Sequence, residues 1–428
     1  MKSVVYDCLY MSKKAFLNSL VAEVSRIDDA QVTKRKEHLI EGFTSDPSPK
    51  AIIGSKEYRI FNSNDYLGLR HFDKVKKAEH SASERYGAGP GAVRFISGSL
   101  KVHRDLEKAL AKFHGREDAM VFSSAFATNL AVIFSLIKGQ SRDSLVSSKT
   151  LVISDELNHR SIIDGIRLAN LPKDQKKIFK HLDADSLRTV LSENIGKFDR
   201  AVVITDGVFS MLGEYQDLKM LNKVITEFDK KYDQGVLSIV DDCHGIGAFG
   251  KTGRGTEEIS GAQGDVLVGT LGKGFGVDGG YVVANQKIID YLRESAATYI
   301  YSNSISPGTA GAALAAVKIA SSKEGEKLVK KLEKNIEQLK DGLKAAGFSF
   351  AADSIHPIQP ILIGETEKTK AFTGEMYKAG FLVTNINYPV VPKGKDEIRV
   401  QLSASHTKED IDIFIQSAIK VGKKLKII

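Results

Sequence analysis

Short apolar runs alternate with helix-like spacers between residues 61 and 305, and this alternation constrains the fold more than any other feature of the sequence. The runs are almost uniformly apolar, as expected of strands that are covered on both faces. The spacers at 183–199 and 215–233 repeat apolar residues with the period of an α-helix. Strands separated by helices require crossover connections, so the pattern predicts an α/β fold with a mostly parallel sheet. The strand candidates are DAMVFSS, TLVISDE, RAVVITDGVFS, GVLSIVDD, DVLVGTLGK and GGYVVAN.

The two ends of the chain differ from this central part. Residues 1–60 are charged and helix-prone and become loop-like around TSDPSPKAIIGSKEYRI, which indicates an arm rather than a core. Beyond residue 305 a long helical tract ends at Gly347, and two strand-like pieces follow, PIQPILIGE and DEIRVQLSAS. A last amphipathic helix follows Thr407, a suitable N-cap. We therefore expect an N-terminal arm over 1–60, a large domain over 61–305 and a small α+β domain over 306–428.

Composition excludes several classes of protein. A hydrophobic content of 42% and a charged content of 27% are ordinary for a soluble globular chain. The net charge of +8 is spread over short basic runs that lack aromatic neighbours, so we expect no nucleic-acid partner. Cys8 and Cys243 lack the spacing of a metal site or a disulfide framework, so we expect no metal and a reducing compartment. Without a secretory signal or an apolar span, we expect a cytoplasmic protein with no membrane partner.

The stretch HGIGAFGKT, residues 244–252, fits the spacing of a phosphate-binding P-loop, with Gly245, Gly250, Lys251 and Thr252 in register. A P-loop lysine opens a helix, whereas Gly253 and Gly255 here favour a continued loop. The preceding strand also ends in two acids close to where a triphosphate would lie. We expect the match to be accidental, and a nucleotide hydrolase is the alternative from another class of protein.

Polar residues that can carry chemistry gather at the ends of the predicted strands, where an open parallel sheet binds its ligands. Asp241 and His244 follow one strand, Thr270 and Lys273 another, and His159 and Ser210 two more. Alone, Lys273 could be a solvated strand end, His159 a packing residue or a cap, and Asp241 a helix N-cap. Together they suit pyridoxal phosphate, which needs a lysine for its Schiff base and a carboxylate at its ring nitrogen. Gly272, Gly274 and Gly276 would let the backbone approach a planar ligand.

With these motifs in place, the chain resembles the α-oxoamine synthases, pyridoxal phosphate enzymes of fold type I that condense an amino acid with an acyl-CoA. The resemblance runs from residue 62 to the last helix and implies a large domain with a mostly parallel sheet plus a small C-terminal α+β domain. It also places the P-loop match inside a family motif. The motifs that carry it are NDYLGL, VRFISGS, ELNHRSIIDG, TDGVFSM, VDDCHGIGAFGKTGRG, GTLGKGFG and YIYSNSISP.

The resemblance implies a role for each residue at the ring of the cofactor. Lys273 would bind the cofactor and remove the α-proton of the substrate, and Asp241 would pair with the ring nitrogen. His244 would hydrogen-bond the phenolic oxygen, with Ser210 serving the same region. His159 would stack on the face of the ring.

The resemblance also implies how the cofactor phosphate and the substrate are bound. The turn at Ser124, with the backbone N–H groups of Ala125 and Phe126, would hold the phosphate, with help from Thr270. A second subunit would reach this phosphate through Ser302, Asn303 and Ser304, so the site would need a homodimer. Arg399 would clamp the substrate carboxylate and Asn64 would line the substrate pocket. For these two residues a strand-surface charge and a turn residue are the structural alternatives.

Within the family, the stretches VRFISG, SDELNHRSIIDG, YPVVPKG and IRVQLSASHT favour the glycine C-acetyltransferases, which would make glycine and acetyl-CoA the substrates. Four features depart from that group: SGSLKVH after the glycine, Leu212, Arg160, and GFGVDGG, which is closer to the 8-amino-7-oxononanoate synthases. An enzyme of the latter kind, or one that takes longer acyl chains, is the alternative.

Overall fold

The computed structural model describes residues 2–30, 33–35, 37–139, 141, 143–388 and 390–428, with side chains from residue 13 onwards. It divides into two units. Residues 1–44 and 51–57 form the first, which contains helix α1 (Lys2–Asp29) and the antiparallel strands β1 (Gly42–Phe43) and β2 (Ala51–Ile53). Residues 45–50 and 58–428 form the second, which holds every element discussed below as part of the site. No helix among the described residues is long and apolar enough to cross a membrane.

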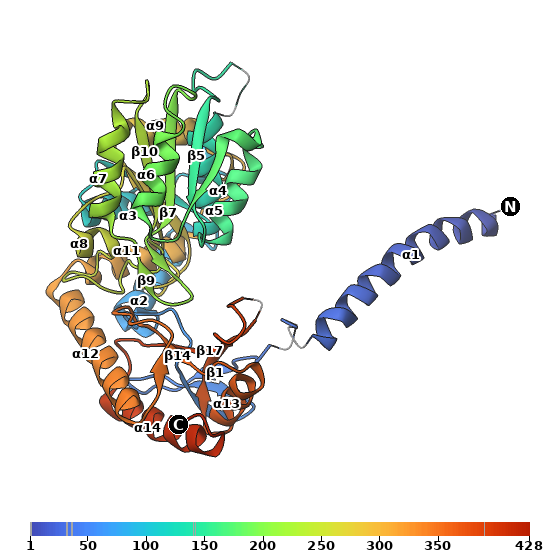
Figure 1. Cartoon of the computed structure of the whole chain (residues 1–428), viewed down its shortest axis with the longest axis vertical. Coiled ribbons are helices and arrows are strands. Elements are labelled where there is room, and N and C mark those ends of the chain that lie inside the picture. The colour runs from blue at the N-terminus through green and yellow to red at the C-terminus, as the bar shows by residue number, and fades with distance from the viewer. Residues whose placement is uncertain (1, 31–32, 36, 140, 142, 389) are drawn as a thin grey trace. The chain divides into compact units, whose positions relative to one another are not determined.

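A seven-stranded sheet, counted over the described residues, is the centre of the second unit (Figure 1). Its strands are, in spatial order, β4 (Asp118–Phe122), β12 (Gly280–Ala284), β11 (Val266–Thr270), β10 (Val236–Asp241), β7 (Arg200–Asp206), β5 (Thr150–Asp155) and β6 (Lys176–Phe179). Only β12 runs antiparallel to its neighbours. The prediction of an α/β fold with a mostly parallel sheet is therefore confirmed.

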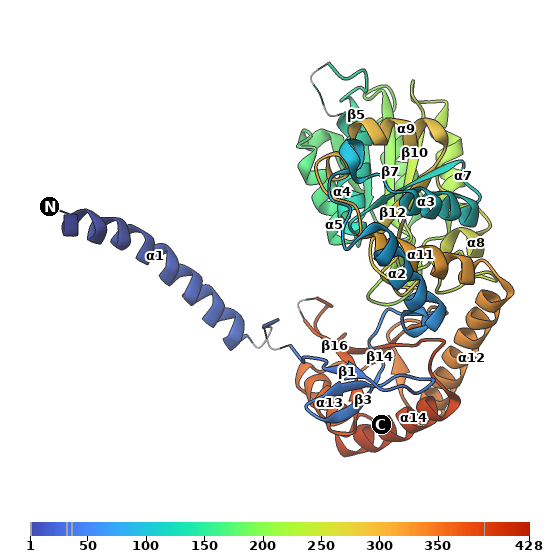
Figure 2. The ribbon, with the colours of Figure 1, turned by 180° about the vertical axis from the view of Figure 1, so that it is seen from behind.

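Both faces of this sheet are covered by helices, which is why its strands are apolar throughout (Figures 1 and 2). Alternate residues of one strand enter different cores: Ala201 and Val203 pack on one side, Val202 and Ile204 on the other. The first face is covered by α3 (Lys101–His114), α6 (Ala184–Ser192), α7 (Leu218–Asp229) and α11 (Pro307–Ala320). The second is covered by α4 (Ala125–Lys138), α5 (Arg160–Leu168) and α9 (Gln286–Ser295).

A smaller antiparallel sheet is formed by the C-terminal part of the chain. Its order is β13 (Ser349–Phe350), β14 (Ile358–Leu362), β17 (Glu397–Gln401) and β16 (Thr384–Ile386). Helices α12 (Lys323–Ala345), α13 (Thr366–Lys378) and α14 (Lys408–Lys424) share a hydrophobic core with β14 and β17. The predicted N-cap is confirmed, because the hydroxyl of Thr407 accepts the N–H of Asp410 and the Asp410 carboxylate accepts the N–H of Thr407.

The remaining elements are short or connect the two sheets. They are β3 (Lys56–Ile60), η1 (Leu69–His71), α2 (Asp73–Tyr86), the π-helical turn η2 (Arg94–Gly98), η3 (Lys173–Gln175), β8 (Val208–Phe209), β9 (Glu214–Tyr215), α8 (Thr256–Ser260), α10 (Ala297–Ile300) and β15 (Phe381–Leu382).

The expectation of a loop around residues 51–60 was wrong. These residues contain β2 and β3, and Arg59 and Ile60 of β3 pair in parallel with Phe381 and Leu382 of β15. Arg59 also donates a hydrogen bond of 2.8 Å from Nε to Asp410. The turn residues in this stretch hid the alternation of polar and apolar residues in KEYRI, the ordinary pattern of a half-buried strand. The domain boundaries at 60 and 305 stay predictions.

Candidate active site

The carboxyl ends of β5, β7, β10 and β11 meet at one edge of the large sheet, because these four strands are parallel. A cavity of about 110 Å³ lies there. Most of the residues singled out from the sequence line it: Ala125, Phe126, His159, Ser210, Asp241, His244, Thr270 and Lys273. Residues separated by more than a hundred positions thus surround one small space. Ser124, Asn64, Arg399, Asn303 and Ser304 are not in its lining.

Asp241 is the last residue of β10 and is buried. Its carboxylate is fixed by two donors: Asn129 Nδ2 donates to Oδ2 at 2.5 Å, and the N–H of Cys243 donates to Oδ1 at 3.0 Å. The amide of Asn129 also donates to the hydroxyl of Ser161. Donors on both oxygens set the orientation of this carboxylate before any ligand arrives.

His159 caps the N-terminus of α5 and presents its ring to the cavity. Its Nδ1 lies 2.8 Å from the Ser161 hydroxyl, and its N–H donates to Asp206 Oδ2 at 2.9 Å. Burial lowers the pKa of His159, against the opposing effect of Asp241, so the imidazole is neutral at physiological pH. The cap alternative is also true, because Nδ1 of the ring accepts the N–H of Ser161 at 3.3 Å while the same ring lines the cavity.

Asp206 lies beside Asp241 at the end of the neighbouring strand β7. Burial, and then the negative charge of Asp241, raise the pKa of the Asp206 carboxyl well above its usual value. Of the two carboxyl groups at this strand end, Asp241 is the one held by donors on both oxygens.

Lys273 follows β11 and is half-buried in the cavity wall. Its ammonium makes no ion pair within the described part of the chain, which leaves the amine available to a ligand. Two of the three glycines around Lys273, Gly274 and Gly276, have a different purpose from the expected one. A Cβ on Gly274 would lie 2.4 Å from the carbonyl oxygen of Ile246, and one on Gly276 would lie 2.5 Å from the backbone nitrogen of Arg70. These two glycines permit close packing of the protein on itself rather than approach of a ligand.

His244 is held by two aromatic neighbours. Its Nδ1 lies 2.8 Å from the hydroxyl of Tyr66, and its carbonyl oxygen accepts a hydrogen bond of 2.7 Å from His356 Nε2. Burial lowers the pKa of His244 well below its usual value, with Lys273 adding to the effect. The ring is therefore a neutral hydrogen-bonding group in the cavity wall.

Helix α4 begins at the cavity, with Ser124 as its N-cap. The Ser124 hydroxyl accepts the N–H of Ala127, whereas the N–H groups of Ala125 and Phe126 belong to the first turn, which has no intrahelical acceptor. Such a turn is suited to a phosphate dianion. The Thr270 hydroxyl lines the same cavity and donates to the carbonyl of Gly279 at 3.1 Å.

Arg399, on β17, reaches the cavity through Ser210. Its guanidinium donates from Nη1 to the Ser210 carbonyl oxygen at 3.0 Å, while its buried Nε has no partner among the described residues. Asn64 accepts a hydrogen bond from Gln401, the next residue on the same face of β17, and another of 3.3 Å from Tyr66. Arg399 and Asn64 thus form one wall beside the cavity.

Asn303 and Ser304 lie in the loop between α10 and α11, outside the cavity lining. Asn303 is exposed, whereas the hydroxyl of Ser304 is buried without a partner among the described residues. Within this one chain the two residues do not join the site.

Sequence reasoning missed five residues that line the cavity: Asn129, Ser161, Asp206, Val208 and Cys243. Asp206 and Cys243 stand inside the motifs TDGVFSM and VDDCHG, so their position at strand ends was a usable signal. Asn129 is a buried amide within an apolar helix, which the helical period alone does not distinguish from core.

The stretch 244–252 does not form a phosphate-binding loop. The N–H groups of Thr252 and Arg254 donate to the Glu258 carboxylate, so internal acceptors already occupy them. The next helix, α8, begins only at Thr256 and has five residues. The geometry supports the expectation that this motif match is accidental.

Comparison with known proteins identifies the family. The pattern of the class I and II aminotransferases matches residues 57–417. The 8-amino-7-oxononanoate synthase of Petrotoga mobilis is 39% identical over 420 residues, which covers 96% of this chain and 99% of that protein. That of Thermosipho melanesiensis is 40% identical over 379 residues, with 88% and 91% covered.

The chain belongs to the α-oxoamine synthases. A solved structure of serine palmitoyltransferase from S. paucimobilis with bound pyridoxal phosphate superposes with a TM-score of 0.84 at 27% identity, covering 97% of this chain and 99% of the other. The resemblance drawn from the motifs and the fold of a type I pyridoxal phosphate enzyme are confirmed. Pyridoxal phosphate is the cofactor.

The residues present fit this cofactor. The cavity offers an unpaired lysine amine, an oriented carboxylate at Asp241, a neutral imidazole at His159 and the free first turn of α4. These are the groups that a phosphorylated pyridinium aldehyde requires.

Proposed function

We propose that this α-oxoamine synthase is an 8-amino-7-oxononanoate synthase, which condenses L-alanine with pimeloyl-CoA and releases CoA and carbon dioxide. The observation that carries the proposal is 39% identity to such an enzyme over nearly the whole length of both chains. Loss of carbon dioxide after joining a seven-carbon acyl group to alanine gives the nine carbons of that product. The preference for glycine and acetyl-CoA drawn from the motifs is not supported by the relatives, and the alternative fits them better.

Each side chain of the site has a task in this reaction. Bound pyridoxal phosphate supplies a protonated ring that withdraws electrons from a bond at the substrate Cα. Asp241 would hold the proton on the ring nitrogen, and the Lys273 amine would move the α-proton. His159 would cover the ring as a neutral imidazole and exclude water from that face. The N–H groups of Ala125 and Phe126 bind the phosphate.

Arg399 and Asn64 would bind the amino acid. The guanidinium is fixed through Nη1 by the Ser210 carbonyl, and its Nε has no partner among the described residues, so it keeps a donor for a ligand. A carboxylate matches the planar fork of such a group. The wall at β17 would thereby set the orientation of the Cα substituents.

A homodimer would complete the phosphate site through Asn303 and Ser304 of a second copy. Support comes from apolar surface near their loop: Phe95, Ile96 and Tyr301 are exposed by 64%, 65% and 78%. These residues belong to adjacent elements, because the Arg94 guanidinium of η2 lies 5.3 Å from the ring centroid of Tyr299 in α10. Exposed aromatic and aliphatic residues of this kind are typical of subunit interfaces.

The substrate assignment is tested with a panel that pairs acetyl-, hexanoyl- and pimeloyl-CoA with glycine, L-serine and L-alanine. Release of free CoA is measured with the cofactor-loaded protein. We expect kcat/KM for pimeloyl-CoA with L-alanine to exceed that for acetyl-CoA with glycine by at least about tenfold, the discrimination that a few contacts along an acyl chain provide. A preference for acetyl-CoA and glycine would overturn the proposal and restore the motif-based assignment.

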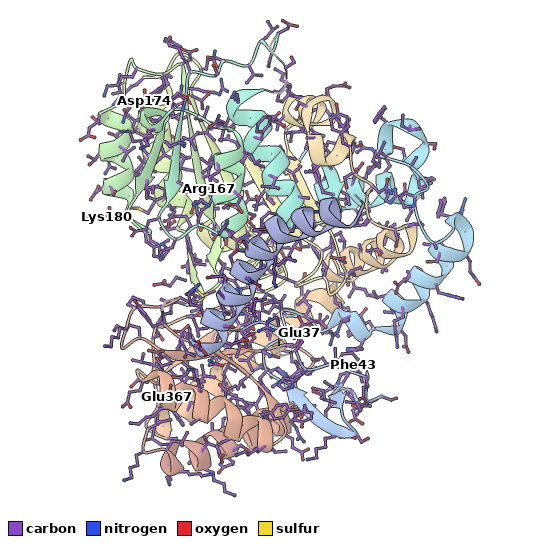
Figure 3. The ribbon with its side chains drawn as sticks, turned by 90° about the vertical axis from the view of Figure 1, so that its right-hand side faces the viewer. Glu37, Phe43, Arg167, Asp174, Lys180 and Glu367 are labelled. Carbon is purple, nitrogen blue, oxygen red and sulfur yellow. The ribbon has the colours of Figure 1, made fainter. Side chains whose placement is uncertain are left out.

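Replacing Arg399 with alanine is expected to raise KM for the amino acid about 100-fold, since the charge-assisted hydrogen bonds to its carboxylate are lost. KM for the acyl-CoA should change much less. The matched control is Arg167→Ala, because Arg167 is an arginine of α5 whose side chain is 65% exposed (Figure 3). Equal effects of the two substitutions on KM for the amino acid would contradict this role of Arg399.

A further inference from the structure

Glu397 is a buried acid without a partner. It is the first residue of β17, its side chain is fully buried, and neither carboxylate oxygen has a hydrogen-bond partner among the described residues. Buried carboxyl groups are normally paired or hydrogen-bonded, since an isolated buried charge is costly. A functional explanation is therefore needed for this residue.

Glu397 lies on the face of β17 that carries the proposed substrate wall. Ile398 and Val400 enter the hydrophobic core of the small sheet, so Glu397, Arg399 and Gln401 point to the opposite face. Two residues apart on a strand, the Cα atoms of Glu397 and Arg399 are about 7 Å apart. Both side chains are long enough to contact one small ligand, and no ion pair of 4.0 Å or less joins them.

The charged groups that face Glu397 are Arg399 on its own strand and Glu214 on β9. Its register neighbours, Leu362 on β14 and Ile386 on β16, are apolar. Burial raises the pKa of the Glu397 carboxyl to about 8; Arg399 opposes this rise and Glu214 adds to it. At neutral pH the group is a neutral acid that can donate one hydrogen bond.

Arg399 is also incompletely satisfied, because its buried Nε has no partner among the described residues. Two donors without acceptors, an N–H of Arg399 and the O–H of Glu397, therefore lie on one wall. The ligand that satisfies both is an anion with two acceptor oxygens.

We propose that Glu397 is a specificity-determining residue that donates a hydrogen bond from its carboxyl group to the carboxylate of the amino-acid substrate, alongside Arg399. The inference rests on the proposed function, in which Arg399 binds that carboxylate. It adds a second donor to the subsite, and this donor is lost when Glu397 ionises.

Affinity for the amino acid should therefore fall as the pH rises. Below about pH 8 Glu397 keeps its proton and donates. Above that pH it becomes a second carboxylate facing the substrate carboxylate, so affinity for the amino acid falls by up to about tenfold per pH unit. The group acts on binding, so KM for the amino acid should change and kcat should change little.

The test compares Glu397→Gln and Glu397→Ala in the cofactor-loaded protein between pH 6.5 and pH 9.5. Glutamine keeps an N–H donor and does not titrate, so we expect KM for the amino acid within about threefold of wild type at pH 7, without the alkaline rise seen in wild type. Alanine removes the donor and should raise KM at pH 7 by about 10- to 100-fold. The matched control is Glu367→Gln on α13, where the side chain is 84% exposed (Figure 3).

A binding measurement separates this inference from the proposed function. Calorimetry with propionate, which has the carboxylate of alanine but no amine, should show at pH 9 the uptake of close to one proton by wild type and none by Glu397→Gln. Superimposable KM profiles of wild type and both variants, or equal proton uptake by wild type and Glu397→Gln, would overturn the role of Glu397 while leaving the proposed function intact. Proton-linked propionate binding without turnover of any substrate pair would instead overturn the proposed function and support the subsite.

Discussion

Replacing Lys273 with alanine is expected to lower kcat by at least about 10⁴-fold, because the substitution removes both the amine that binds the cofactor and the group that moves the α-proton. The visible absorption of lysine-bound pyridoxal phosphate should disappear from the purified protein as well. The side chain is half-buried in the cavity wall and makes no ion pair within the described residues, so the fold should persist. Free CoA release, an absorption spectrum and a thermal melting curve check the three expectations.

Lys251→Ala is the matched control for this prediction. Lys251 is the exposed lysine of the P-loop-like stretch and does not line the cavity. Its replacement should leave activity and absorption unchanged. Activity of Lys273→Ala within tenfold of wild type, or an equal loss in Lys251→Ala, would contradict the assignment of the catalytic lysine.

Replacing Asp241 with asparagine should lower kcat about 10³-fold while the protein stays folded. The asparagine is nearly isosteric and can still accept a hydrogen bond from Asn129 or from the N–H of Cys243, but it removes the negative charge that keeps the cofactor nitrogen protonated. The chemical step should suffer far more than binding of the amino acid. Steady-state kinetics with saturating cofactor measure the difference.

Asp206→Asn provides a sharp comparison, because Asp206 is an equally buried carboxyl on the adjacent strand. Burial raises the pKa of Asp206 well above its usual value, which favours the neutral acid over the carboxylate. An amide oxygen can still accept the N–H of His159, as Asp206 does now. We expect less than about a fivefold change in kcat, and a loss as large as that of Asp241→Asn would mean that the two acids act as one unit.

Much of the fold could be predicted from the sequence. A strand that is covered on both faces is a continuous apolar run, whereas a helix with one apolar side repeats apolar residues with the helical period. The runs VVITD and LSIVD lie in β7 and β10, and the last helix begins after its N-cap Thr407. Residues 51–60 were misread because two short strands among Pro, Gly and Ser carry too few residues for a clear period. The antiparallel direction of β12 could not be predicted either, because a buried strand has the same apolar pattern in both directions.

The residues of the candidate site were predictable where a side chain suited to the cofactor directly follows a predicted strand. Asp241, His244 and Lys273 follow strands that run parallel, so their convergence follows from topology alone. Asn129 and Glu397 could not be found in this way. Asn129 lies in an apolar helix. Glu397 looked like an ordinary charged residue of a strand, whereas its functional interest comes from complete burial with no hydrogen-bond partner among the residues that the structure describes.

The amino-acid sequence by itself determined the α/β architecture and the chemical class of the cofactor, and it supplied candidates for the residues at the cofactor ring, because periodicity and motif order are local properties of the chain. Only the tertiary structure decided which polar groups are paired. It placed Asn129 on Asp241, left the Arg399 Nε and both oxygens of Glu397 without hydrogen-bond partners in the described part of the chain, and assigned Gly274 and Gly276 to backbone packing. Hydrogen-bond pairing depends on which side chains meet from distant segments and on how far burial removes their water. Neither can be deduced from one segment of the sequence.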